Sequence, residues 1–188
     1  MRCLLVLALA ACSSYRGTAH DVDPAKLARE PGWLLLRDVP YVAQRGETEC
    51  GAAALGMVVG FWTGQPPQSI VAALQPVPET GIAAARLRDT ARARGLAAFV
   101  VEGELQDLAN ELKAGRPVIV GLSKPQSRDR VLNHYEVVIG IHADRKLIVT
   151  LDPQGGWRQN SLEGFYREWK IAGFVTLVVS SRGDQAAR

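Results

Sequence analysis

The spacing of apolar residues changes along the chain, and the change separates a helical first part from a second part rich in strands. Residues 50–62 are apolar on every side, which is typical of a helix that is buried all round, and Thr48 is a candidate cap for its start. Residues 104–114 carry leucines at helical spacing on one side only. By these criteria the pattern predicts helices at 26–29, 50–62, 68–74, 82–94, 104–114 and 161–169, and extended chain or strands at 33–36, 39–42, 97–101, 117–122, 134–141, 146–153 and 174–179.

The order of these elements indicates the class of fold. Most of the helices come first, and the strands at 134–141 and 146–153 follow one another across a turn at Asp144 and Arg145, as in an antiparallel hairpin. Helices and strands that are segregated along the chain favour an α+β fold. We therefore expect an N-terminal helical part that packs on a C-terminal antiparallel sheet.

The length and the charge of the chain bear on the number of domains and on the class of partner. The 188 residues suit one domain with a real core, which we expect at 32–180, with a polar loop at 123–133 and a polar tail at 181–188. The formal net charge is +3, and the charged residues are dispersed along the chain. Dispersed charge of this size does not favour a nucleic-acid partner.

The first residues have the features of an export signal. A basic start is followed by the apolar run 3–10, which is too short to cross a bilayer. The next motif, Leu9-Ala10-Ala11-Cys12, resembles the bacterial lipobox, in which the cysteine is lipidated and becomes the mature N-terminus. This resemblance implies a signal peptide at 1–11 and a lipidated Cys12 that opens a tether over 12–31.

The residue after Cys12 bears on where such a lipoprotein resides. Ser13, in place of aspartate, is typical of lipoproteins sent to the outer membrane of a Gram-negative cell, with the domain facing the periplasm. The sequence thus predicts an exported protein held to a membrane by lipid alone. The alternative is that this segment forms a buried first strand in which the cysteine occurs by chance.

Cysteine usage draws attention to a single residue. The chain has three cysteines, and two of them, Cys3 and Cys12, fall in the predicted export segment. Cys50 is therefore the only thiol in the predicted folded domain and has no partner there for a disulfide. Because an unpaired thiol outside the cytosol is prone to oxidation, its presence favours a chemical role over a packing role.

The surroundings of Cys50 suit a nucleophile. It stands at the predicted start of a helix, where unpaired amides and the helix dipole lower the pKa of a thiol. His134 begins one strand of the predicted hairpin and Asp152 ends the next, so both come to one end of the sheet, as a base and its orienting group require. Gln44 lies six residues before Cys50, and its amide, with the Cys50 N–H, is a candidate oxyanion donor. The other histidines, His20 and His142, are expected away from this site.

These motifs resemble those of the peptidase C39 family, papain-like cysteine peptidases that process bacteriocins. The family has a glutamine before an acidic residue, the cysteine and a Gly-x-Ala motif, which correspond to Gln44 and Glu49-Cys50-Gly51-Ala52-Ala53. A second motif corresponds to His134-Tyr135-Glu136-Val137-Val138, and an Asp-Pro pair after the hairpin to Asp152-Pro153. The resemblance extends over about residues 39–179 and implies a papain-like fold.

The resemblance also implies an activity and a partner. It implies a cysteine peptidase in which Cys50 attacks, His134 moves protons, Asp152 orients His134 and Gln44 binds the oxyanion. The substrate would be a peptide or protein, such as a flexible leader or an exported segment. The family's best-known members belong to transporters that cut after a double glycine in the cytosol, whereas this sequence carries an export signal and no ATPase motif.

Two other functions fit the same motifs. One is a catalytically idle module of the same fold that binds peptides. The other is a papain-like acyl transferase, which would make an amide rather than hydrolyse it. The sequence predicts no organic cofactor and no metal site, because no cluster of histidine, cysteine and acidic residues has the spacing of metal ligands.

Overall fold

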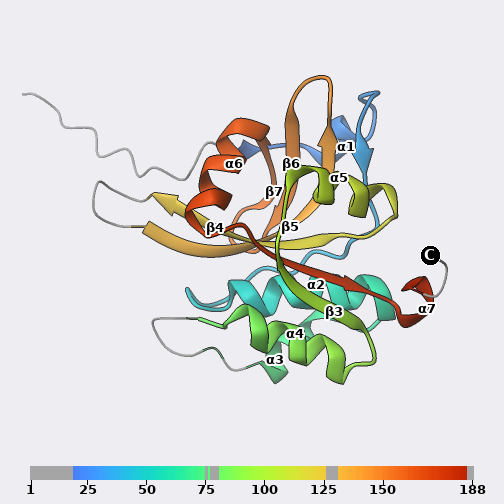
Figure 1. The fold of residues 1–188 in the computed structure, drawn as a ribbon, viewed down its shortest axis with the longest axis vertical. Helices are drawn as coiled ribbons and strands as arrows, with labels where there is room; N and C mark the ends of the chain where they lie inside the picture. The colour runs from blue at the N-terminus through green and yellow to red at the C-terminus, as the bar shows by residue number, and fades with distance from the viewer. Residues whose placement is uncertain (1–18, 75, 77–80, 126–130, 186–188) are drawn as a thin grey trace, which may run out of the picture.

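One antiparallel sheet runs through the centre of the protein and has helices on both faces (Figure 1). The computed structural model describes residues 19–74, 76, 81–125 and 131–185, and eight strands lie within these ranges. The strand order is β1-β7-β6-β5-β4-β8-β3, and β2 pairs with β5 outside this path. The strands are β1 (His20–Asp21), β2 (Leu34–Leu35), β3 (Ala97–Glu102), β4 (Val118–Pro125), β5 (Val131–His142), β6 (Leu147–Asp152), β7 (Gly156–Ser161) and β8 (Val175–Ser180).

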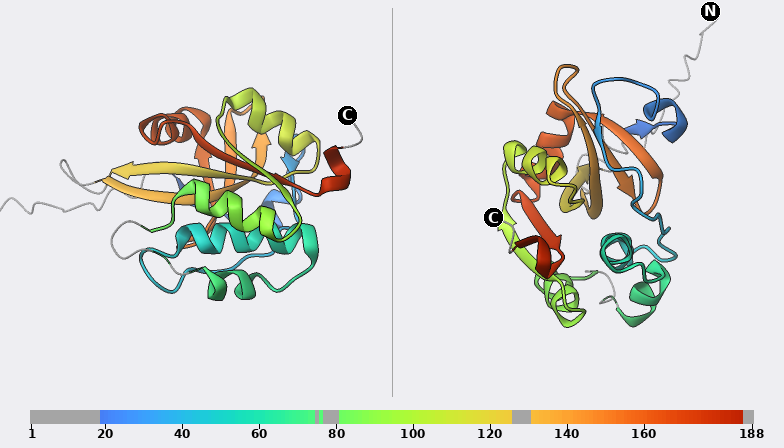
Figure 2. Two further views of the ribbon diagram at one scale, coloured as in Figure 1. Left: turned by 60° about the horizontal axis from the view of Figure 1, so that its bottom comes forward. Right: turned by 90° about the vertical axis from the view of Figure 1, so that its right-hand side faces the viewer.

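The helices fall into two groups according to the face of the sheet that they cover. α2, α3 and α4 lie on one side of the sheet and α5 and α6 on the other (Figures 1 and 2). Each group has its own apolar core against the sheet. The helices are α1 (Pro24–Leu27), α2 (Cys50–Thr63), α3 (Pro67–Ala73), α4 (Ala84–Ala93), α5 (Leu105–Lys113), α6 (Leu162–Ile171) and α7 (Arg182–Gln185).

α2 is the most deeply buried helix, and its sequence explains why. All residues from Cys50 to Gly60 are buried, so a helix that is apolar on every side can pack between the sheet and α3 without exposing a face. A Cβ atom on Gly51 would lie 3.2 Å from the Tyr135 ring of β5. The glycine therefore lets the first turn of α2 approach the strand that carries His134. Gly64, with a φ of 69°, ends the helix in the left-handed conformation that glycine favours.

The α+β class, the central hairpin and the main helices confirm the fold predicted from the sequence, with small shifts of the helix ends. Four details differ. The polar segment 156–161 forms β7, which the apolar pattern could not reveal because the pairing with β6 and β1 is made by the backbone. The predicted loop at 123–133 is shorter, since Lys124 belongs to β4 and Asn133 to β5.

The remaining two differences concern caps and termini. Thr48 does not cap α2; Glu49 is the residue before the helix and makes no side-chain cap bond. Part of the segment expected to be a tether packs on the domain, because β1 pairs with β7 and Leu27 of α1 is 1% exposed. The predicted signal peptide and Cys12 lie outside the described residues. Among the described helices, none has the length and apolar character needed to cross a membrane.

Candidate active site

Cys50 is the first residue of α2 and lies against the strand that carries His134. It is a free, buried thiol with 7% of its surface exposed. Burial raises the pKa of the thiol, but the hydrogen bond with His134, the charge of His134 and the backbone amides of Tyr135 and Gly51 bring the pKa below its usual value. The start of the helix adds its dipole in the same direction. The site thus favours a thiolate.

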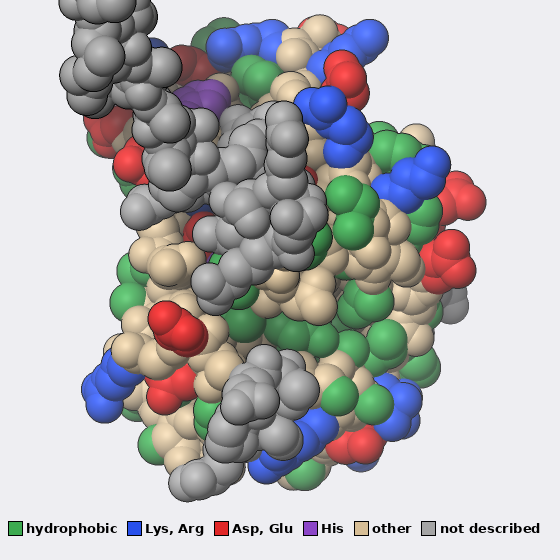
Figure 3. Space-filling model, turned by 90° about the vertical axis from the view of Figure 1, so that its left-hand side faces the viewer, with side chains coloured by type: hydrophobic (Ala, Val, Ile, Leu, Met, Phe, Trp, Pro, Cys, Tyr) green, Lys and Arg blue, Asp and Glu red, His purple; other side chains and the backbone are tan. Residues whose placement is uncertain are grey.

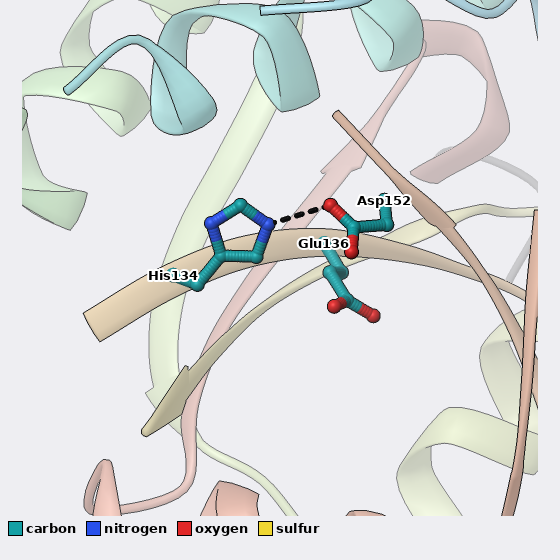
Figure 4. A group of neighbouring side chains, drawn as sticks. All are labelled: His134, Glu136 and Asp152. Atoms are coloured by element: carbon teal, nitrogen blue, oxygen red, sulfur yellow. Dashed lines mark hydrogen bonds and ion pairs between the residues drawn. The ribbon is translucent and has the colours of Figure 1, made fainter. Parts of the chain in front are cut away.

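His134 and Asp152 meet at one end of the β5–β6 hairpin, as the sequence predicts. The imidazole Nε2 lies 2.7 Å from Asp152 Oδ1, and the two groups face one another in Figure 4. Because Nε2 is engaged with Asp152, Nδ1 is the ring nitrogen left for the hydrogen bond with Cys50. Oδ1 of Asp152 also accepts a 2.8 Å hydrogen bond from the Gln154 amide, which holds the carboxylate in place at the turn.

The charges of this pair reinforce one another. Burial of His134 opposes its protonation, but the hydrogen bonds with Asp152 and Cys50 and the charge of Glu136 raise the pKa of His134 to about 9. Burial likewise opposes ionisation of Asp152, and the bond to His134 and the charge of Lys124 hold the pKa of this carboxyl well below its usual range. An ionised Asp152 next to an imidazolium is therefore the expected state at neutral pH.

Gln44 lies beside the same end of the hairpin. Its backbone N–H donates to the Pro153 carbonyl at 2.9 Å, one residue after Asp152. Its side-chain Nε2 donates to the Gly46 carbonyl at 3.0 Å, and its Oε1 is buried with no hydrogen-bond partner within the described part of the chain. The predicted role of Gln44 as an oxyanion donor stays a prediction, since this amide is bonded within its own loop.

The Gln44 loop is held by Glu49, whose role the sequence did not suggest. Glu49 Oε2 accepts hydrogen bonds from the backbone amides of Arg45 at 2.8 Å and Gly46 at 3.1 Å. The acidic residue before the cysteine thus closes the loop that joins Gln44 to Cys50.

A buried ion pair lies behind Asp152 and was not expected from the sequence. Glu136 is 1% exposed, so it faces the interior, and in Figure 4 its carboxylate is turned away from the imidazole. It forms an ion pair with the ammonium of Lys124 and accepts a 2.6 Å hydrogen bond from Thr150 Oγ1. Nζ of Lys124 also lies 3.4 Å from Asp152 Oδ2. The sequence pattern predicts a polar loop at Lys124 and gives no sign of its burial beside two acidic residues.

The same cluster has the dimensions of a cation site. Ligand atoms of His134, Glu136 and Asp152 lie within 4.8 Å of one another, which is compact enough for a metal ion. However, the Lys124 ammonium already contacts both carboxylates, and His134 Nε2 is bonded to Asp152. A metal ion would have to enter next to this positive charge, so the donor set does not fit a resident metal.

The other two histidines lie away from the site. His20 belongs to β1, at the edge of the sheet, and His142 is at the far end of β5, where its ring meets the edge of Trp33. The starts of α2 and β5 lie on the same side of the molecule in Figure 1, and Figure 3 views that side. Where Figure 3 shows described residues, side chains of both charges are interspersed with hydrophobic ones.

A family model and several solved structures are similar to this chain. The model of the peptidase C39 family matches residues 38–182, which is most of the chain. The chain belongs to the peptidase C39 family. Members of this family are cysteine peptidases, and the family assigned from the sequence motifs is confirmed. A comparison with curated proteins gives no match.

Solved C39 structures confirm the papain-like fold. A putative C39-like peptidase from Bacillus anthracis is 17% identical, with a TM-score of 0.64 and coverage of 80% of this chain and 98% of the other. The peptidase domain of Streptococcus ComA, a transporter of a quorum-sensing pathway, is 20% identical, with a TM-score of 0.61 and coverage of 77% and 99%. A double-glycine-motif protease of a transporter, solved with its leader peptide, is 24% identical, with a TM-score of 0.59 and coverage of 77% and 92%. At these identities the likeness concerns the fold.

Proposed function

We propose that this C39 chain is a cysteine peptidase that cleaves a peptide bond through Cys50, His134 and Asp152, with Gln44 as an oxyanion donor. The observation that carries the proposal is the order of the three groups: the Cys50 thiol interacts with His134, which lowers the pKa of the thiol, and His134 Nε2 lies 2.7 Å from Asp152 Oδ1. A nucleophile, a proton carrier and an orienting carboxylate in this order are what acyl chemistry on a thiol requires.

In the first half of the reaction, the Cys50 thiolate attacks the carbonyl carbon of the scissile bond. The negative charge that develops on the carbonyl oxygen is stabilised by the Cys50 N–H and the Gln44 amide, whose two N–H groups are not both used by Gly46. The C–N bond then breaks while His134 Nδ1–H gives its proton to the leaving amine. A thioester on Cys50 and a free amine result.

In the second half, neutral His134 takes a proton from water, and the oxygen of that water attacks the thioester carbon. The C–S bond breaks, the carboxylic acid leaves, and Cys50 and His134 return to the thiolate and imidazolium. Asp152 keeps the imidazole oriented in both halves. It also stabilises the positive charge on the ring whenever the ring is protonated.

The proposed substrate is an extended segment of a peptide or protein. Support comes from the C39 relative solved with its leader peptide. An idle peptide-binding module and an acyl transferase remain the alternatives, and they differ from a peptidase in their products. A peptide-binding module would return its peptide intact. A transferase would join the acyl group to an added amine.

These alternatives are separated by product analysis. Residues 19–188 are incubated with a mixture of unstructured peptides, with and without a primary amine, and the new termini are read by mass spectrometry. Cys50→Ala is the matched control, because it removes one sulfur atom and keeps a helix-forming residue. The proposal expects new carboxyl termini only with the wild-type Cys50. Intact peptides that are bound equally by both proteins would overturn it, and amine adducts as the main product would indicate transfer.

We further propose that the protein is tethered to a membrane through a lipid on Cys12, with the domain outside the cytosol. The proposal rests on the lipobox-like Leu9-Ala10-Ala11-Cys12 motif. Metabolic labelling of the full chain in a bacterial host with a palmitate analogue tests it. Label and membrane association should both be lost in Cys12→Ser. A membrane-associated, unlabelled wild-type protein would contradict the lipid anchor.

A further inference from the structure

Lys124 and Glu136 are buried charges beside the candidate site that the proposed reaction does not use. Lys124 is 5% exposed, close to the end of β4, and its ammonium forms ion pairs with Glu136 and Asp152. Burying an ammonium is costly unless its partners are well placed. Glu136 alone would neutralise Lys124, so the contact with Asp152 calls for a separate explanation.

The two oxygens of Asp152 are held by different partners. Oδ1 contacts His134 Nε2 at 2.7 Å and the Gln154 amide at 2.8 Å. Oδ2 lies 3.4 Å from Lys124 Nζ. The carboxylate of Asp152 can rotate about its Cβ–Cγ bond, which exchanges the positions of Oδ1 and Oδ2. The two groups that contact Oδ1 do not prevent this exchange, because either oxygen could accept from them. A cation at Oδ2 distinguishes the two oxygens and fixes the plane of the carboxylate.

We propose that Lys124 is a positioning residue for the reaction of Cys50: its ammonium holds Oδ2 of Asp152, so that Oδ1 stays directed at His134. This inference rests on the proposed function, because it assigns Lys124 a role through Asp152 and His134. Glu136 in turn anchors Lys124 and is itself anchored by Thr150. Thr150 therefore holds Glu136, Glu136 holds Lys124, and Lys124 holds Asp152 in place beside His134.

The charges of Lys124 and its two acidic partners support the same positioning role. The positive charge of Lys124 lowers the pKa of Asp152, after the hydrogen bond from His134. The charges of Glu136 and Asp152 raise the pKa of Lys124 against the effect of burial, so the ammonium persists throughout the neutral range. Without Lys124, Asp152 would take up a proton at a higher pH than in the wild type. Protonated Asp152 no longer stabilises the imidazolium of His134, and the Cys50 thiolate then loses the positive charge that stabilises it.

Several other charged groups surround Asp152 or Lys124 and share in this balance. They come from every element that packs here: Tyr41 from the segment before α2, Cys50 from α2, His134 and Glu136 from β5, Arg158 from β7 and Glu168 from α6. A test must therefore compare two proteins that differ at Lys124 and are alike at all these groups.

The test compares two variants that both lack the Lys124–Glu136 ion pair. Glu136→Gln keeps Lys124 beside Asp152, whereas the double variant Lys124→Met/Glu136→Gln removes the ammonium without leaving Glu136 unpaired. The single change Lys124→Met would leave the buried carboxylate of Glu136 without a cation and is expected to fold poorly, so the double variant takes its place. Residues 19–188 of each variant react with iodoacetamide from pH 4.5 to 9, and their unfolding in urea is measured in parallel.

We expect the acid limb of the Cys50 alkylation rate to stay near the wild-type position in Glu136→Gln. In the double variant it should move to higher pH by about one unit, so that alkylation at a pH on the limb is about tenfold slower, because an opposite charge at this distance lowers the pKa of an aspartate by about 1–3 units and a less acidic Asp152 stabilises the imidazolium less well. The two variants should converge above pH 8. Coincident acid limbs in two equally folded variants would overturn the positioning role.

Failure of the proposed function gives a different result. If wild-type Cys50 itself reacts like an ordinary thiol, with no reactivity at acidic pH, then the activated thiol is absent and the proposed reaction falls. If the wild type shows the acid limb and both variants keep it, only the role of Lys124 falls.

Discussion

The two halves of the candidate site are built in different ways. His134 and Asp152 lie on neighbouring strands. Lys124 contacts Asp152 from behind and is held by Glu136, which is held in turn by Thr150, all of them through buried side chains. Cys50 and Gln44 belong to a loop and the first turn of a helix. There the restraints are backbone hydrogen bonds, from Gln44 to Pro153 and from Arg45 and Gly46 to Glu49.

The sheet half controls the charges of the site, and the loop half controls the geometry of the oxyanion donors. The sheet half sets the protonation of His134 through buried ion pairs, whose loss is costly because no water can replace the missing partner. The loop half sets the placement of donors, and its exposed bonds can be exchanged with water. We therefore expect changes in the sheet half to alter charge and stability strongly, and changes in the loop half to alter mainly catalysis, and by less.

The largest effect on catalysis is expected from Asp152→Asn in the sheet half. The amide keeps the shape of the side chain but removes the negative charge that stabilises the imidazolium of His134. Proton transfer by a positioned group contributes about 10²–10⁴-fold to a rate, so kcat/KM for peptide cleavage should fall within that range. Cleavage assays on a peptide identified by mass spectrometry check this. A variant that retains most of its activity would remove Asp152 from the mechanism.

The next effect concerns stability. Glu136→Ala leaves the Lys124 ammonium without its main partner, and breaking a buried ion pair from one side costs about 3–5 kcal/mol. Urea unfolding at pH 7 measures the loss. The matched control is Glu102→Ala, an exposed glutamate on β3, for which the change should stay within about 0.5 kcal/mol. Equal losses in both variants would mean that Glu136 is not held in a buried pair.

The smallest effect is expected in the loop half, from Glu49→Ala. The Arg45 and Gly46 amides lose their acceptor, and Gln44 becomes less well placed, so kcat/KM should fall about tenfold while the free energy of unfolding falls by only about 1 kcal/mol. Glu47→Ala, in the same loop and exposed, is the control and should change neither quantity. If Glu49→Ala destabilised the domain as much as Glu136→Ala, the two halves would not differ as described.

The parts of this site that local patterns encode could be predicted. A buried helix that begins at Cys50 and a hairpin that brings His134 and Asp152 together follow from apolar spacing and turn positions. The 2.7 Å hydrogen bond between His134 and Asp152 agrees with the predicted hairpin. The fold class was predictable for the same reason, because the helices and most strands carry periodic apolar residues.

The remaining parts depend on contacts between distant segments. The sequence predicts a loop at Lys124, because a lone lysine is rarely buried. Its burial is possible only because Glu136 and Asp152 approach it from two other strands. The strand β7 lacks an apolar pattern and exists through its backbone pairing with β6 and β1. The orientation of the Gln44 amide depends on how its loop meets Pro153.

One measurement tests the paired thiolate and imidazolium directly: the rate of Cys50 alkylation by iodoacetamide between pH 5 and 9, in the wild type and in His134→Ala. Because the thiol pKa is lowered and the pKa of His134 is raised to about 9, wild-type Cys50 should still react at pH 6, where an ordinary thiol is almost wholly protonated. In His134→Ala the rate at pH 6 should fall by at least about tenfold and then rise with pH as for an ordinary thiol, with a pKa of about 8.5. Equal and slow alkylation of both proteins at pH 6 would contradict the account.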